Sequence, residues 1–168
     1  MSHPLVLALF ADRTAAAVAA RGVRDLGIDR GDLSIVARAH DDEVDLARVV
    51  DGTPGAEIED SRLGSWLGEL SGHLLAAIAI VMPGVGPIVT AGPLAAELGE
   101  TVGHATGGLA STLERAGLSE AAAEGWQSKI ENGAVLLGVH VRAGQELEIR
   151  KLLERNGADG VAMANWGD

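Results

Sequence analysis

The chain has 168 residues and a formal net charge of −11, with 24 Asp and Glu against 13 Lys and Arg. Its length fits one domain with a sizeable core, and the lack of a clustered basic stretch argues against a nucleic acid partner. It has no cysteine, which excludes disulfides and thiolate metal sites and leaves its five histidines as soft-metal ligands.

The opening stretch, MSHPLVLALFADR, does not fit a secretory signal peptide. It has no basic segment, and its apolar run from Leu5 to Ala11 is too short. We therefore expect a cytoplasmic protein.

The first forty residues predict a strand, a helix and a second strand. PLVLALF at 4–10 is an apolar run of strand length. Residues 12–27 follow as an Ala-rich amphipathic helix, with Gly27 as its stop, and DLSIVAR at 32–38 alternates like a strand.

The end of the chain repeats this order. Residues 133–142 predict a strand, 144–157 a helix that stops at Gly157, and 158–164 a short strand. Two such halves predict an α+β fold with a ferredoxin-like sheet of four antiparallel strands and two helices on one face. We expect a single domain over 1–168, with its sheet built from 4–38 and 133–164.

Roughly ninety residues separate the two halves. Residues 40–60 are acidic and interrupted by Gly-Thr-Pro-Gly, which predicts a linker or β-ribbon. A helical hairpin is expected over 61–117, with helices at 61–82 and 94–117 separated by Pro83, Gly84, Gly86 and Pro87. A helix with Ser119 as its N-cap is expected at 118–132.

Three stretches resemble the heat-induced general stress proteins of the YflT-like type. They are VLALFADRTAAAVAARGVRDLGI, the central Gly-rich hairpin and GLSEAAAEGWQSKIENGAVLLGVHV, and together they span most of the chain. The resemblance implies a bacterial stress-response protein of ferredoxin-like type. It implies no catalytic residues.

Glycines recur every four residues on both helices of the expected hairpin, at 64, 68 and 72 and again at 99, 103 and 107. Each interior glycine costs about 1 kcal/mol against Ala, so these stripes indicate close approach of another helix, a second subunit or a flat ligand. We expect a homodimer through or near the hairpin. Membrane insertion is an alternative, although the prolines divide the apolar run into halves too short to cross a bilayer.

The phrase Gly-Glu-x-x-Gly-His occurs twice and ends at His73 and at His104. In an antiparallel helical hairpin these histidines fall on one face, within reach of one metal centre. Arg62 and Arg115 stand eleven residues outside them on the same faces, and Gly72 and Gly103 leave space beside a ring. This pattern predicts a haem site, with axial imidazoles and arginines for the propionates.

Two readings of the histidine pair stay open. The pair can bind haem or another metal, or it can be solvated while the glycine stripes drive self-association without a ligand. His40 and His140 are weaker candidates, because His140 alternates with apolar strand residues, and His3 is expected in a terminal tail. No phosphate loop, nucleophile elbow or HExxH motif is present, so we expect no enzyme activity.

Overall fold

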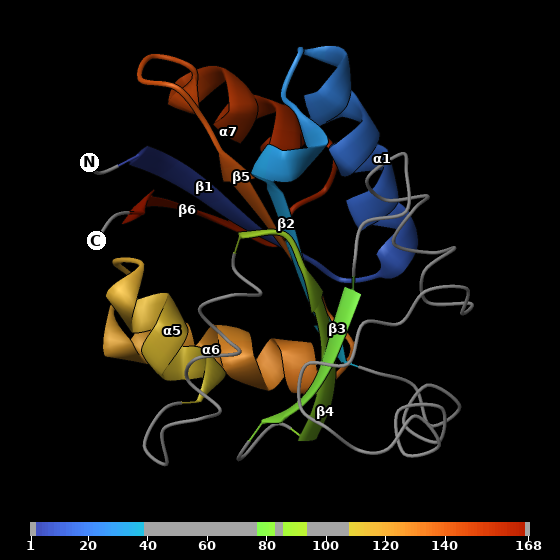
Figure 1. Cartoon of the computed structure of the whole chain (residues 1–168), viewed down its shortest axis with the longest axis vertical. Helices are drawn as coiled ribbons and strands as arrows, with labels where there is room; N and C mark the ends of the chain where they lie inside the picture. Colours follow the sequence, from blue (N-terminus) through green and yellow to red (C-terminus); the bar gives the residue numbers. More distant parts are fainter. Residues whose placement is uncertain (1–2, 39–76, 83–85, 94–107, 167–168) are drawn as a thin grey trace.

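The computed structural model describes residues 3–38, 77–82, 86–93 and 108–166, which form a mixed α+β structure (Figure 1). The strands are β1 (His3–Phe10), β2 (Leu33–Arg38), β3 (Ala77–Met82), β4 (Gly86–Ala91), β5 (Val135–His140) and β6 (Gly160–Trp166). The helices are α1 (Arg13–Asp25), α5 (Leu109–Arg115), α6 (Glu120–Glu131) and α7 (Glu146–Arg155), and η1 is a 3₁₀ turn at Arg30–Asp32. The predicted α+β class is confirmed, and both ends of the chain have the expected strand-helix-strand order.

The strands of the described ranges form one antiparallel sheet in the order β3-β4-β2-β5-β1-β6. β1 lies between β5 and β6, so Leu7 faces Gly138 on one side and Ala162 on the other. The two terminal halves therefore interleave, because β1 of the first half pairs with both strands of the second. At one end of the sheet His3 pairs with Trp166.

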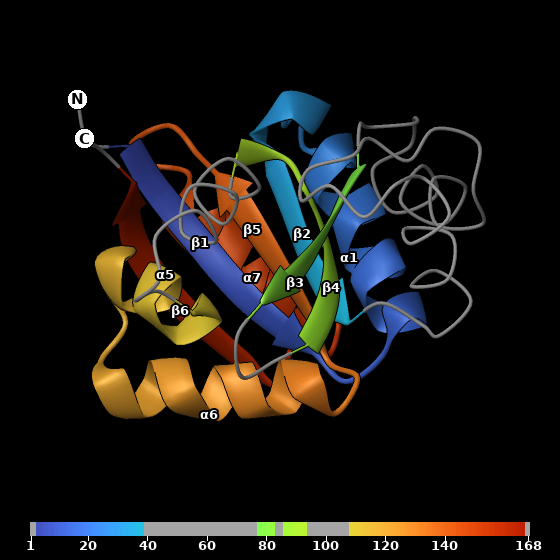
Figure 2. The same cartoon turned by 60° about the horizontal axis from the view of Figure 1, so that its bottom comes forward.

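Helices cover both faces of this sheet, as Figures 1 and 2 show. On the α1/α7 face, the core packs Val6, Phe10, Ile35 and Leu137 of the sheet against Ala16, Ala20 and Val23 of α1 and Ile149 and Leu153 of α7. On the α5/α6 face, it packs Leu5, Leu7, Leu9 and Leu136 against Leu109 and Leu113 of α5 and Ile130 of α6.

The two helices that we expected on one face, α1 and α7, do share a face, and the opposite face of the sheet is covered by helices as well. β1 is apolar from Leu5 to Phe10 without alternation, and every one of these side chains is fully buried. A strand with apolar residues on both sides needs cover on both sides of its sheet. α5 and α6, which come from the long connection between the two halves, provide the second cover.

Local signals set the ends of the helices, and the expected stop at Gly27 and cap at Ser119 are confirmed. The Asp12 side chain accepts a hydrogen bond from the backbone N–H of Ala15 at 2.8 Å and caps α1. Ser119 accepts from the N–H of Ala122 and caps α6. Gly27 follows α1 with a φ of +86°, a left-handed conformation that glycine adopts without steric cost.

The predicted helix over 61–82 is wrong for its last six residues, which form β3. This strand pairs with β4 from Ala77–Ala91 to Met82–Gly86, so the turn region that we expected to join two helices joins two strands. The run AIAIVM contains β-branched residues, and Pro83 and Gly84 follow it. Short apolar runs of this kind can form either a strand or a helix. Here the run forms a strand because it pairs with β4, which in turn pairs with β2.

Other parts of the long connection are described only in part. Of the second helix, expected over 94–117, only Leu109–Arg115 is described as helix (α5), and the extended backbone of Gly108 shows that this helix begins at Leu109. The helix expected at 118–132 is confirmed as α6. The predicted acidic linker at 40–60 and the segments 61–76 and 94–107 lie outside the described residues. Within the described ranges, no helix has the length and apolar character needed to cross a membrane.

Candidate functional site

The six residues of the predicted haem site are mostly outside the described part of the chain. Arg62, Gly72, His73, Gly103 and His104 fall in the ranges that the structure does not describe. Arg115 is described, and it is an exposed residue in the last turn of α5. The haem site was predicted for two antiparallel helices joined by a turn. The residues on either side of that turn form the strands β3 and β4 instead.

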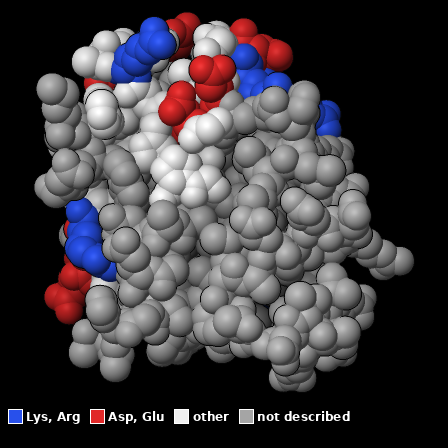
Figure 3. Space-filling model, in the orientation of Figure 1, with Lys and Arg blue, Asp and Glu red and all other residues white. Residues whose placement is uncertain are grey.

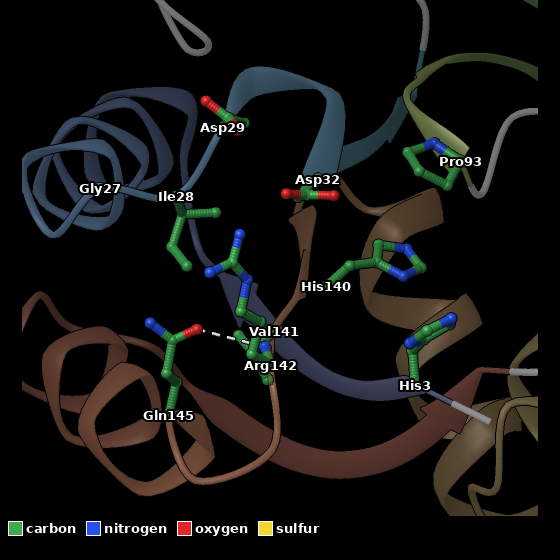
Figure 4. Close-up of a pocket in the computed structure, with 10 residues that line it drawn as sticks. All are labelled: His3, Gly27, Ile28, Asp29, Asp32, Pro93, His140, Val141, Arg142 and Gln145. Atoms are coloured by element: carbon green, nitrogen blue, oxygen red, sulfur yellow. Dashed lines mark hydrogen bonds between the residues drawn. The ribbon is translucent and has the colours of Figure 1, made fainter. Parts of the chain in front are cut away.

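A pocket lies at the end of the sheet where β1 and β2 begin and β5 ends (Figure 4). Its cavity has a volume of about 520 Å³, which is within the range of small-molecule sites. Its walls come from the start of β1, the connection between α1 and β2, and the loop between β5 and α7. Pro93, shortly after β4, adds a further part of the wall. The lining residues are His3, Gly27, Ile28, Asp29, Asp32, Pro93, His140, Val141, Arg142 and Gln145.

Strand register brings three of the polar residues together. β2 pairs Leu33 with Val139, so one step further along both strands places Asp32 beside His140. β1 pairs Leu5 with His140, and His3 lies two residues before Leu5 on the same side of the strand. The pocket therefore receives its histidines and this aspartate from neighbouring strands.

The loop between β5 and α7 carries Arg142 and is held by hydrogen bonds. The Val141 N–H donates to the carbonyl of Pro4 at 3.0 Å, and the Arg142 N–H donates to Oε1 of Gln145 at 3.2 Å. The Gly144 N–H donates to Oε2 of Glu146 at 2.6 Å. With its backbone fixed in this way, Arg142 projects its guanidinium into the centre of the pocket (Figure 4).

His140 is half-buried, and its Nε2 atom is shielded from solvent. Burial lowers the pKa of His140 from its ordinary value of 6.5, the nearby Asp32 carboxylate opposes this shift, and His3 adds to it. The imidazole is therefore neutral at neutral pH. In that form it has one N–H donor and one acceptor nitrogen.

The pocket combines both signs of charge without neutralising its arginine. Among the described residues the Arg142 guanidinium forms no ion pair. On helix α7, which follows this loop, Arg150 Nε instead pairs with Glu154 Oε1 at 2.9 Å. Asp29 and Asp32 are exposed on the opposite wall. Over the described part of the face in Figure 3, basic and acidic side chains are interspersed, so neither sign dominates.

The polar side chains of the pocket offer hydrogen-bond donors and acceptors to a small polar molecule. In the described ranges, no group of three or more His, Asp or Glu side chains is placed to hold a metal. A guanidinium, two imidazoles and two carboxylates around one cavity can instead form hydrogen bonds with a ligand that has both acceptors and donors.

Only part of this site is predicted by the sequence. His140 is a weaker candidate there and His3 is expected in a tail, whereas His3 is the first residue of β1. Nothing in the sequence pattern singles out Asp29, Asp32, Arg142 or Gln145. The available signal was position: Asp32 immediately precedes one strand and Arg142 closely follows another, but only the sheet order makes these ends neighbours.

No protein-family model matches the sequence, no curated protein matches it, and no solved structure matches its fold. The resemblance to general stress proteins therefore stays a prediction from the sequence. Function is inferred from the chemistry of the pocket, since a fold alone does not determine function.

Proposed function

We propose that this protein is a non-enzymatic binding protein that takes a small organic anion into the pocket at the end of its sheet. The observation that carries the proposal is the Arg142 guanidinium, which projects into a cavity of about 520 Å³ and forms no ion pair among the described residues. A guanidinium presents paired N–H donors that match the two oxygens of a carboxylate or phosphate group.

The opposite wall narrows the class of ligand. Asp29 and Asp32 are acceptors, and they favour a molecule that also carries a hydroxyl or ammonium group. Ile28, Val141 and Pro93 add a limited apolar surface for a short carbon chain. Hydroxy acids and amino acids combine these features, with the acid group toward Arg142 and the donor toward the aspartates.

The wider setting that we propose is a ferredoxin-like core in a cytoplasmic stress-response protein. The order β6-β1-β5-β2, with α1 and α7 packed on the same face, supports the ferredoxin-like core. β3, β4, α5 and α6 are then additions to it. The stress role rests on the sequence resemblance alone.

Thermal unfolding with a small panel of ligands tests the pocket proposal. Malate and serine carry both an acid group and a donor, succinate carries acid groups only, and glycerol carries hydroxyls only. A ligand that binds the folded state raises the melting temperature, and at equal concentration a tighter ligand raises it more. We expect the largest rise with malate or serine, a smaller one with succinate and none with glycerol. Equal melting temperatures with all four compounds would contradict the proposal.

Haem binding through His73 and His104 is a second proposal, with Arg62 and Arg115 for the propionates. It is supported by the pairing of β3 with β4, in which Ala77 lies opposite Ala91. The chain therefore enters and leaves this β-hairpin at one end, with His73 four residues before β3 and His104 thirteen residues after β4. Nearby starting points allow both histidines to reach one ligand.

A further inference from the structure

β6 is the last strand of the sheet order in the described part of the molecule. Its sequence, GVAMANW, has no charged residue and no proline, although the chain as a whole has a net charge of −11. Natural proteins usually protect an edge strand with charges, prolines or bulges, because its peptide groups can pair with another strand. β6 has neither of the first two, which suggests that this edge is used for pairing.

One hydrogen bond shows which peptide groups of β6 face outward. The Asn165 N–H donates to the carbonyl of Ala116 at 3.3 Å and therefore points away from β1. Peptide groups alternate in direction along a strand, so those of Val161 and Met163 point to the same side as that of Asn165. Ala116 covers the end of the edge at Asn165, and within the described residues the peptide groups from Val161 to Met163 have no partner on this side.

We propose that this stretch pairs with the same stretch of a second copy of the chain, antiparallel, about a two-fold axis at Ala162. Val161 then lies opposite Met163 of the partner subunit, and Met163 opposite Val161 of the partner subunit. Each of these is a hydrogen-bonded pair that exchanges two N–H···O bonds. The two sheets become one continuous sheet across the dimer.

The side chains fit this pairing as well as the backbone does. β1 pairs Val6 with Met163 and Ala8 with Val161, which places Met163 and Val161 on the α1/α7 face. The Met163 side chain is 44% exposed, although it is large and apolar. In the proposed dimer each Met163 packs against Val161 of the partner subunit, a cross-strand apolar contact that occurs twice.

The edge of β6 is better suited to pairing with a second copy of the chain than with another partner. A two-fold pair needs a surface that is complementary to itself, and a short neutral stretch centred on Ala162 meets that condition. Two copies of a chain with a charge of −11 repel each other, so contact at a strand without charges minimises that repulsion.

Sedimentation equilibrium with Met163→Lys and Leu147→Lys tests the proposal. Leu147 on α7 is 59% exposed, so its substitution is a matched control that removes an exposed apolar side chain outside the paired stretch of β6. Met163→Lys places two ammonium groups beside the two-fold axis, and we expect the dimer dissociation constant to rise roughly tenfold or more. Leu147→Lys should leave it unchanged, and circular dichroism should show both variants folded.

Hydrogen exchange of the wild-type protein gives a readout that does not depend on a variant. We expect the amides of Val161 and Met163 to exchange more slowly as protein concentration rises, while the amide of Asn165, already bonded to Ala116, changes little. A wild-type protein that stays monomeric over the concentration series would overturn the proposal. A dimer that Met163→Lys and Leu147→Lys affect equally would overturn it too, and would favour self-association through another surface.

Discussion

Asp32 and His140 lie side by side at the ends of β2 and β5, one step beyond the paired residues Leu33 and Val139. Two influences act in opposite directions on protonation of His140. Burial of the imidazole lowers its pKa, and the neighbouring Asp32 carboxylate raises it. Burial is the larger influence, so the pair is a neutral imidazole beside a carboxylate at neutral pH. This relationship makes the pocket sensitive to pH.

His140→Gln should reduce the dependence of stability on pH. Because the pKa of His140 in the folded state is below its ordinary value of 6.5, the unfolded state binds the proton more readily. The stability that neutral His140 contributes is present above pH 6.5 and is lost as the pH falls through the lowered pKa. Urea unfolding between about pH 5 and pH 8 measures this effect. Equal pH slopes for the wild type and His140→Gln would refute the account of His140.

Two glycine substitutions should change stability in opposite directions. A Cβ added at Gly125, exposed in α6, meets no atom within 4 Å, so Gly125→Ala should raise the free energy of unfolding by about 0.5–1 kcal/mol. Gly92 has a φ of +85°, and a Cβ there collides with the carbonyl oxygen of Leu33. Gly92→Ala should therefore cost about 3 kcal/mol or more. Urea unfolding of both variants checks this pair, and a Gly92→Ala protein as stable as the wild type would show that β4 does not approach β2 as described.

Hemin titration followed by absorbance tests the second proposal. If His73 and His104 are axial ligands, His73→Ala and His104→Ala should each alter the ferric haem spectrum, and the double variant should lose tight binding. Binding should also weaken as the pH falls through the histidine range near 6.5, because coordination needs neutral imidazole. His40→Ala is the matched control and should leave the spectrum unchanged. A double variant with the wild-type spectrum and affinity would exclude this site.

Most of the fold could be predicted because its signals are local. The apolar run of β1, the Asp12 and Ser119 caps and the stops at Gly27 and Gly157 each depend on a few neighbouring residues. The run at 77–82 was wrongly predicted as the end of a helix, because its apolar pattern is equally typical of a helix and of a strand. Only the pairing of β3 with β4, and of β4 with β2, distinguishes the two. The helix cover on the second face was missed for a similar reason, since it depends on where a distant segment packs.

The pocket could not be predicted because it depends on sheet order. His3, Asp32, His140 and Arg142 are spread over almost the whole chain, and no motif links them. They meet because β5 lies between β1 and β2, so that the start of β1, the start of β2 and the end of β5 share one end of the sheet. The repeated Gly-Glu-x-x-Gly-His phrase was visible in the sequence, and its meaning stays a prediction.

Isothermal calorimetry with malate on Arg142→Gln tests the central claim most directly. Arg155→Gln, an exposed arginine in the last turn of α7, is the matched control for the loss of one positive charge. If Arg142 holds the acid group of the ligand, Arg142→Gln should weaken binding by about 1.5–3 kcal/mol, roughly 10- to 160-fold, while Arg155→Gln binds as the wild type does. Equal affinity of the wild type and Arg142→Gln for malate, or no binding of malate by the wild type, would contradict the claim that this pocket binds a small organic anion through Arg142.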